Sequence, residues 1–174
     1  VIGVSAGNQL AGGDANVFVG CFTASGHTTG CFNTALGTCA GWCSRTGSCN
    51  VWLGYKAGGG DNSVCNVASS NIAIGMEAGA CVCSGDNNVI AGKYAGKGRA
   101  ATGNDNVFLG SYAGTEFTTG NKNVFLGMCA AYLARTLSSS VVIGSCAGKC
   151  RCSGTENVFI GKDSGKGSST ASNN

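Results

Sequence analysis

The chain of 174 residues lacks proline altogether and has a single histidine, 7% aromatic residues and 11% charged residues. Soluble domains usually carry about 25% charged residues. A net charge of +3 on so few charged groups predicts no basic patch for nucleic acid. The lone histidine, His27, lies in a Thr-rich stretch and is interpreted as a solvated loop residue. Mechanisms of the Ser-His-Asp or Cys-His type have no other candidate, so we expect no enzyme activity.

Other absences exclude further classes of protein. No apolar run approaches the ~20 residues of a membrane-spanning helix. No Gly-x-x-x-x-Gly-Lys-Ser/Thr phosphate loop and no Asn-x-Ser/Thr glycosylation signal occurs. The 31 glycines do not follow the three-residue period of collagen. No signal peptide is visible and the sequence starts in mid-pattern at Val1-Ile2-Gly3, so it is expected to be a mature or excised segment.

A regular repeat, with a period of seventeen, is the dominant feature of the sequence. One set of glycines recurs with this period, and most successive glycines of the set are 17 residues apart. Two steps are longer, from Gly54 to Gly75 and from Gly92 to Gly110. The set consists of Gly3, Gly20, Gly37, Gly54, Gly75, Gly92, Gly110, Gly127, Gly144 and Gly161. Asparagine stands four places before eight of these glycines, and Ser140 takes that place once. Ten units therefore cover nearly the whole chain.

Each unit contains a short β-branched or aromatic segment between Asn and Gly, which predicts a strand of four or five residues. A single short strand cannot bury its own face, so the units must stack. We predict an all-β fold, a parallel β-solenoid or β-roll of about ten 17-residue rungs, on the order of 50 Å long. The solenoid is expected to form one domain over residues 1–167, followed by a Ser/Asn-rich tail at 168–174. The extra residues after Gly54 and Gly92 are expected to bulge out without breaking the phase.

The faces of the coil are assigned by numbering each unit from its Asn as position 1. Positions 2 and 4 are aliphatic in most units and are predicted to point inward, opposite a small Ala at position 8. Position 3 would then point outward as an apolar stripe for self-association. The stripe consists of Phe18, Trp52, Ile90, Phe108, Phe125, Val142 and Phe159, with Ala35 and Ala73 between them. A second layer of the same chain could cover this stripe, as could other copies in a trimer or a filament.

The Asn column itself has two interpretations. The side chains either cap a corner or bond from rung to rung as an amide ladder, or each Asn simply tolerates a left-handed turn conformation.

The 12 cysteines indicate an oxidising compartment and disulfide staples between rungs. The candidate pairs are Cys129 with Cys146, Cys21 with Cys39, and Cys31 with Cys49, while Cys65 could reach Cys49 or Cys81. Bridges between subunits are predicted for Cys43, Cys81, Cys83, Cys150 and Cys152. Free or locally paired thiols are the alternative. A structural metal is a weaker alternative, because Cys-x-Cys is an uncommon zinc spacing, and no cofactor is expected.

Two stretches resemble known repeat proteins. Asn71 to Gly79 (Asn-Ile-Ala-Ile-Gly-Met-Glu-Ala-Gly) resembles the head repeats of trimeric autotransporter adhesins. The unit Asn106 to Gly120 is similar to arrays in phage tail-fibre and bacterial surface proteins. The resemblance implies a left-handed parallel β-roll assembled as a trimer and used as an adhesive or spacer shaft. The adhesin heads have shorter units, and neither group is usually rich in cysteine.

The sequence thus predicts a structural protein that is extracellular, at a cell surface or on a virion, and that associates with itself as a fibre or filament segment. An adhesin that binds surface glycans is one alternative, with Trp42, Phe117 and Tyr132 as stacking residues. An ice-binding protein is another. Its face would present Thr28, Thr29, Thr46, Thr118, Thr119 and Thr136.

Overall fold

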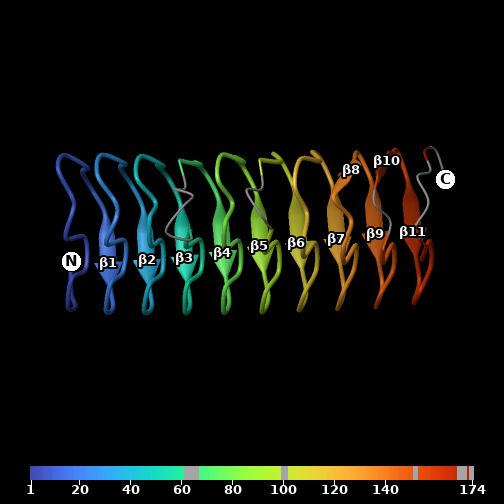
Figure 1. The fold of residues 1–174 in the computed structure, drawn as a ribbon, viewed down its shortest axis with the longest axis horizontal. Coiled ribbons are helices and arrows are strands. Elements are labelled where there is room, and N and C mark those ends of the chain that lie inside the picture. The colour runs from blue at the N-terminus through green and yellow to red at the C-terminus, as the bar shows by residue number, and fades with distance from the viewer. Residues whose placement is uncertain (61–66, 99–101, 151–152, 168–171, 173–174) are drawn as a thin grey trace.

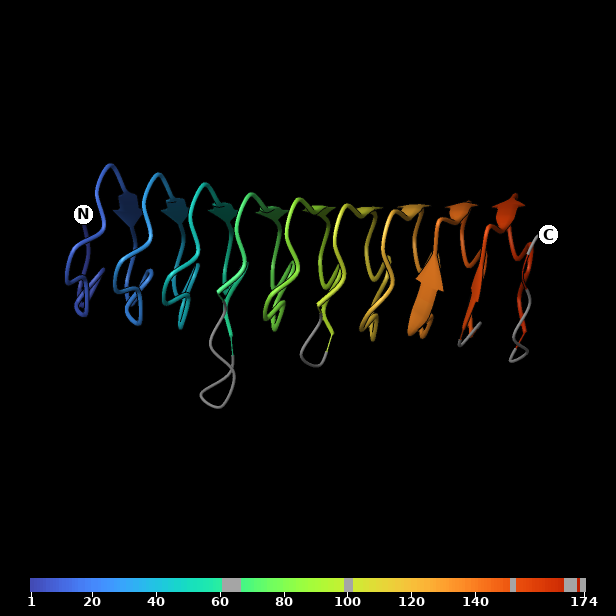
Figure 2. The ribbon, with the colours of Figure 1, turned by 90° about the horizontal axis from the view of Figure 1, so that it is seen from above.

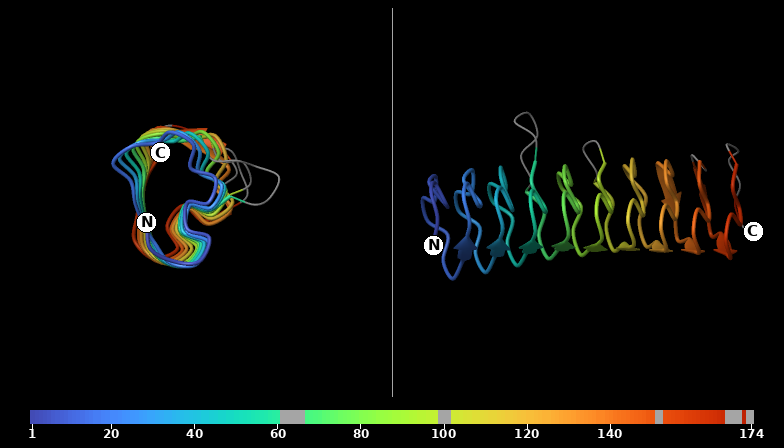
Figure 3. Two further views of the ribbon diagram at one scale, coloured as in Figure 1. Left: turned by 90° about the vertical axis from the view of Figure 1, so that its left-hand side faces the viewer. Right: turned by 90° about the horizontal axis from the view of Figure 1, so that it is seen from below.

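The computed structural model describes residues 1–60, 67–98, 102–150, 153–167 and 172. The chain winds into a rod of stacked turns whose two ends lie at opposite ends of the long axis (Figure 1). Viewed along that axis, successive turns nearly superpose (Figure 3). The strands are β1 (Val17–Val19), β2 (Thr34–Leu36), β3 (Val51–Leu53), β4 (Ile72–Ile74), β5 (Val89–Ala91), β6 (Val107–Leu109), β7 (Val124–Leu126), β8 (Thr136–Ser138), β9 (Val141–Ile143), β10 (Ser153–Thr155) and β11 (Val158–Ile160).

Nine of the strands form one parallel sheet in the order β1-β2-β3-β4-β5-β6-β7-β9-β11. This sheet lies along one side of the rod (Figure 2). Each strand pairs with the equivalent residues of the next unit, and Ile2 extends the sheet through a bridge to Val19. The register runs through both insertions, since Val51 pairs with Ile72 and Val89 with Val107. The all-β parallel solenoid predicted from the glycine period is therefore confirmed.

A second, two-stranded sheet joins β8 to β10 elsewhere on the coil. These strands occupy positions 14 to 16 of their units, where no strand was expected. Of the predicted tail 168–174, only Ser172 lies within the described residues; its hydroxyl accepts a hydrogen bond from the Thr155 amide. Loop residues 61–63 and Cys65 also fall outside the described residues.

The predicted direction of the strand side chains is wrong. The stripe residues Phe18, Trp52, Ile90, Phe108, Phe125, Val142 and Phe159 are all buried, and so are Ala35 and Ala73. Positions 2 and 4 are half-buried or exposed in every strand of the nine-stranded sheet. Because side chains alternate along a strand, position 3 must point away from positions 2 and 4, but the alternation does not say which of the two faces is inside. The interior accepts one strand side chain per turn, so position 3 fills it and the aliphatic pair faces outward.

The interior is packed by matching large residues at position 3 with very small ones across the coil. The predicted inward Ala at position 8 is confirmed, for example Ala40, Ala57 and Ala113 with no exposed surface. Glycine at position 9 leaves room for the ring of Trp52, because a Cβ added to Gly58 would clash with that ring. Side-chain volume is thus balanced within each turn, as close packing requires.

An aromatic cluster fills the interior near β6 and β7. The rings of Phe108 and Phe125 stack with centroids 4.9 Å apart and planes 10° apart. Phe117 packs edge-on against both, at 5.1 Å and 5.7 Å. Offset-stacked and edge-to-face pairs are the favoured aromatic geometries. Phe117 is therefore a core residue, which removes it from the predicted glycan-stacking set.

His27 is also an interior residue, contrary to its interpretation as a solvated loop residue. It has no exposed surface, and its ring packs edge-on against Phe18 at 5.3 Å. Its Nδ1 lies 2.5 Å from the Ser44 carbonyl oxygen and its Nε2 lies 2.9 Å from the Gly30 carbonyl oxygen. His27 and Phe117 both occupy position 12 of their units, so this position is a second inward column.

The Asn column forms a buried amide ladder. Asn50 Nδ2 donates to Asn33 Oδ1 (3.1 Å) and to the Ala68 carbonyl (2.9 Å), and the Asn50 amide donates to Asn33 Oδ1 (2.9 Å). The same pattern links Asn88 to Asn106 and Asn106 to Asn123. Of the two interpretations, the ladder is the correct one. The left-handed conformation belongs to the preceding residue, for example Cys49 with φ 60°.

Candidate functional site

Two surfaces of the rod carry distinctive chemistry. The first is the outer face of the nine-stranded sheet, which we call the outer aliphatic face. It is defined by positions 2 and 4 of nine strands, eighteen residues in all. They are Val17, Val19, Thr34, Leu36, Val51, Leu53, Ile72, Ile74, Val89, Ala91, Val107, Leu109, Val124, Leu126, Val141, Ile143, Val158 and Ile160.

None of these eighteen side chains is charged, and sixteen are Val, Leu or Ile. Several are strongly exposed, such as Val17 at 54%, Leu36 at 51% and Ile160 at 65%. Parallel sheets are normally covered on both faces, and soluble monomers seldom expose a large contiguous apolar patch. The sequence prediction of an outward apolar stripe was therefore right in kind and wrong in residues.

The second surface is a groove formed by the turns that follow the strands, which we call the turn groove. It is lined by positions 7, 10 and 11 of successive units and contains three cavities of about 410, 640 and 190 Å³. Neighbouring cavities share lining residues. Trp42 and Lys56 belong to the first two, while Lys97 and Glu116 belong to the last two. The groove therefore continues from turn to turn along the rod.

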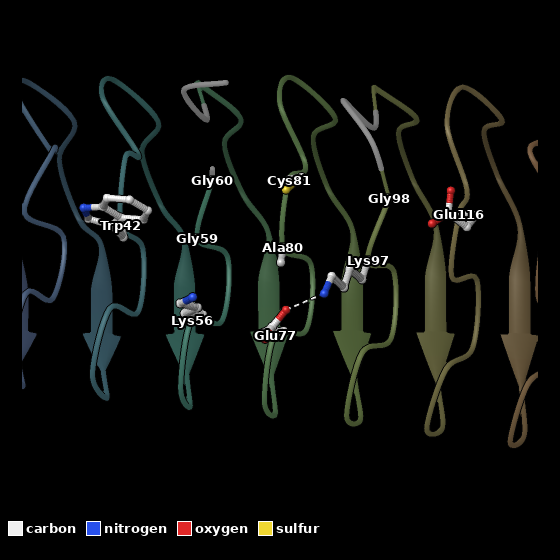
Figure 4. A pocket seen from close by; sticks show the side chains of 10 residues that line it. All are labelled: Trp42, Lys56, Gly59, Gly60, Glu77, Ala80, Cys81, Lys97, Gly98 and Glu116. Carbon is white, nitrogen blue, oxygen red and sulfur yellow. Dashed lines mark hydrogen bonds and ion pairs between the residues drawn. The ribbon is translucent and has the colours of Figure 1, made fainter. Parts of the chain in front are cut away.

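Charged side chains of the groove alternate in sign along the axis. Figure 4 shows Lys56, Glu77, Lys97 and Glu116 on successive turns, with Trp42 one turn before them. Lys97 Nζ lies 2.5 Å from Glu77 Oε2. The hydrogen bond to Glu77 is the main reason why the pKa of Lys97 is raised above its ordinary value. Lys97 therefore keeps its positive charge, and its partner balances that charge.

A row of half-buried tyrosines continues the groove. The rings of Tyr94 and Tyr112 have centroids 5.2 Å apart, and those of Tyr112 and Tyr132 are 6.5 Å apart. Lysine cations lie over both ends of the row, with Lys97 Nζ 4.7 Å from the Tyr94 centroid and Lys149 Nζ 5.5 Å from that of Tyr132. Such cation–π contacts hold the rings in place. Of the aromatic residues proposed for glycan stacking, Trp42 and Tyr132 thus lie in the groove, and Phe117 does not.

The predicted rung-to-rung staples are not formed. Cys129 and Cys146, Cys21 and Cys39, and Cys31 and Cys49 occupy neighbouring turns as expected, but none of these pairs is joined. The Cys129 thiol is close enough to Cys146 to hydrogen-bond with it, and burial together with this neighbour raises the pKa of Cys129. Position in the same column brings the backbones together. Cys39, Cys129 and Cys146 all adopt a left-handed backbone conformation, and their thiols are free.

Four of the five cysteines predicted to bridge subunits are half-buried, namely Cys43, Cys81, Cys83 and Cys150. The fifth, Cys152, lies outside the described residues. Bridges between subunits stay a prediction. Among the described residues, no group of three or more His, Cys, Asp or Glu side chains is placed to hold a metal ion. Within the same residues, no helix has the length and apolar character needed to cross a membrane.

Two of the six threonines considered for ice binding use their hydroxyl protons within the coil. The Thr28 hydroxyl donates to the Arg45 carbonyl and the Thr118 hydroxyl donates to the Arg135 carbonyl, each at 2.9 Å. These hydroxyl protons are engaged by the protein's own backbone, and exposed arginines interrupt the row.

Comparison of the chain with protein-family models, with curated proteins and with solved structures finds no match.

Proposed function

We propose that this chain is a structural, non-catalytic β-solenoid that assembles with copies of itself through the outer aliphatic face. The observation that carries the proposal is the set of eighteen uncharged residues on one exposed sheet face. Standard protein interfaces use about 20–30 residues on each side. The eighteen residues of the face come close to that number, and the residues that flank the strands would complete it.

The arrangement proposed is a parallel trimer. Strands about 4.8 Å apart give each face the same repeat, so three copies at equal height can interdigitate their aliphatic rows around one axis. Mixed charges on either side of the face, such as Lys93, Asp105 and Lys122, supply a polar rim. A location outside the cell, at a cell surface or on a virion, belongs to this proposal and follows from the resemblance of the repeats.

The test is the molar mass of the purified chain by light scattering. We expect three times the chain mass of 17.2 kDa. The double variant Leu109→Glu, Leu126→Glu places two carboxylates on neighbouring strands of the face and should yield monomers, because a buried unpaired charge is costly. The matched control Thr102→Glu, Thr119→Glu adds the same charges at exposed sites away from the face and should stay trimeric.

A wild-type chain that is monomeric at high concentration would contradict the proposal. So would an assembly that persists in the Leu109→Glu, Leu126→Glu variant. A dimer or an open filament would keep the outer aliphatic face as the contact but would refute the trimer.

A further inference from the structure

We propose that the turn groove is a binding site for an extended, uncharged polysaccharide, with pyranose rings stacked along the groove. This inference does not depend on self-association, because the groove and the outer aliphatic face are built from different positions of the repeat. Three features of the groove lead to this ligand class.

The first feature is that aromatic rings stand beside polar groups at both ends of the groove. Rings of Phe22, Trp42, Tyr94, Tyr112 and Tyr132 are partly exposed. Hydrogen-bonding side chains stand beside them in every cavity, including Gln9, Lys56 and Glu116. A pyranose has an apolar C–H face that packs on an aromatic ring and hydroxyls around its rim that donate and accept hydrogen bonds. A ligand of that kind can stack on the rings at the two ends of the groove and hydrogen-bond to the polar side chains between them.

The second feature is the charge balance of the groove. Lys56 and Lys97 face Glu77 and Glu116, and the closest pair, Lys97 with Glu77, already neutralises itself. A polyanion would meet the carboxylates of Glu77 and Glu116, and a polycation would meet these lysines and Lys149, so the groove matches neither. Uncharged hydroxyls can bond to carboxylate and ammonium alike, and hydrogen bonds to charged groups are the stronger ones.

The third feature is that the main chain of the groove is already satisfied. The Tyr112 amide donates to the Lys93 carbonyl, the Glu116 amide to the Lys97 carbonyl and the Gly60 amide to the Trp42 carbonyl. A peptide therefore cannot add a strand to this surface, which is how extended peptides usually gain affinity. The groove also repeats once per turn, which suits a ligand made of identical units.

The probes are two uncharged β-1,4-linked hexasaccharides, cellohexaose and chitohexaose, measured by calorimetry and by saturation-transfer NMR. An α-1,4-linked hexagalacturonate tests the charge argument, and a decaproline peptide tests a polyproline ligand, which aromatic grooves also accept. We expect at least one uncharged hexasaccharide to bind with a Kd below about 1 mM, the affinity of a weak but specific ligand. The other two probes should bind at least tenfold more weakly.

The variant Tyr112→Ala should weaken this binding at least tenfold, whereas Tyr112→Phe, which keeps the ring, should stay within about threefold of the wild type. The matched control is Tyr55→Ala, which removes a tyrosine that lines none of the three cavities. Trp42→Ala repeats the test in the other two cavities should Tyr112→Ala prove unstable. Circular dichroism confirms the fold of each variant.

Absence of binding by both uncharged hexasaccharides overturns the proposal, as does binding that Tyr112→Ala and Trp42→Ala leave unchanged. Tighter binding of decaproline or of the galacturonate would reassign the groove to that ligand class. The assembly state is read from molar mass and the groove from ligand titration, so either proposal can fail without the other.

Discussion

At the scale of single residues, the asparagine ladder explains why the repeat keeps one polar column inside an apolar coil. At most rungs the Asn oxygen accepts two hydrogen bonds and the side-chain amide group donates two, as Asn106 shows with Asn88, Gly120 and Asn123. Buried polar groups are tolerated when they are fully paired. Ser140 keeps part of the pattern, because its amide donates to Asn123 and its hydroxyl accepts from the Asn157 amide.

The ladder leads to a residue-scale prediction. Asn106→Ala removes both Oδ1 and Nδ2, so the Asn123 amide and the Gly120 carbonyl lose partners inside the coil. The free energy of unfolding should fall by about 1–3 kcal/mol, measured by urea denaturation. Asn123→Ser, which copies the natural substitution at Ser140, should cost clearly less. Equal losses for the two variants would argue against the ladder.

At the scale of the strand and the turn that faces it, stability depends on matched volumes across the coil. Large residues at position 3 meet Gly or Ala at positions 8 and 9, and neighbouring turns alternate in size where Ala35 and Ala73 flank Trp52. The close aromatic cluster of Phe108, Phe117 and Phe125 serves the same purpose further along the rod.

This packing predicts a large difference between two substitutions on the same strand, β7. Phe125→Ala opens a cavity and should lower stability by about 3–5 kcal/mol, seen as a lower thermal midpoint by circular dichroism. Leu126→Ala, on the outer aliphatic face of the isolated chain, should cost much less in dilute, monomeric samples. A greater loss from Leu126→Ala than from Phe125→Ala in the monomer would contradict the assignment of the two faces.

At the scale of the whole molecule, the rod is held by contacts between neighbouring turns and, among the described residues, by no disulfide. Stability in such solenoids is approximately a sum of repeat and nearest-neighbour terms. Assembly through the outer aliphatic face would stabilise every turn at once, since each unit contributes two residues to this face.

Reducing agent therefore provides a whole-molecule test. The thermal midpoint should be the same with and without reductant, because the described cysteines are not joined within the chain. A lower midpoint at unchanged mass would reveal an internal bridge, and a fall in mass would reveal bridges between subunits through Cys43, Cys81, Cys83, Cys150 or Cys152. An alkylated sample serves as the control, because its cysteines cannot re-oxidise.

The period of the repeat by itself determined the fold class, and it determined the positions and register of the strands in the nine-stranded sheet. In a parallel stack, equivalent residues must lie above one another, so a sequence period becomes a spatial column. The insertions after Gly54 and Gly92 did not disturb this, because the paired strands on either side keep their register. The small residue at position 8 was likewise predicted on the correct side.

Only the tertiary structure decided which strand face is inside, since alternation gives relative directions and the width of the interior is set by the turns. The size compensation between Trp52 and its Ala and Gly neighbours was the sequence signal that could have shown it. No sequence signal marked the non-glycine residues that adopt a left-handed backbone conformation, such as Tyr94, Tyr112 and Glu116. Positions 7, 10 and 11 come together around the same cavities only when successive turns stack, so the turn groove exists only in the folded coil.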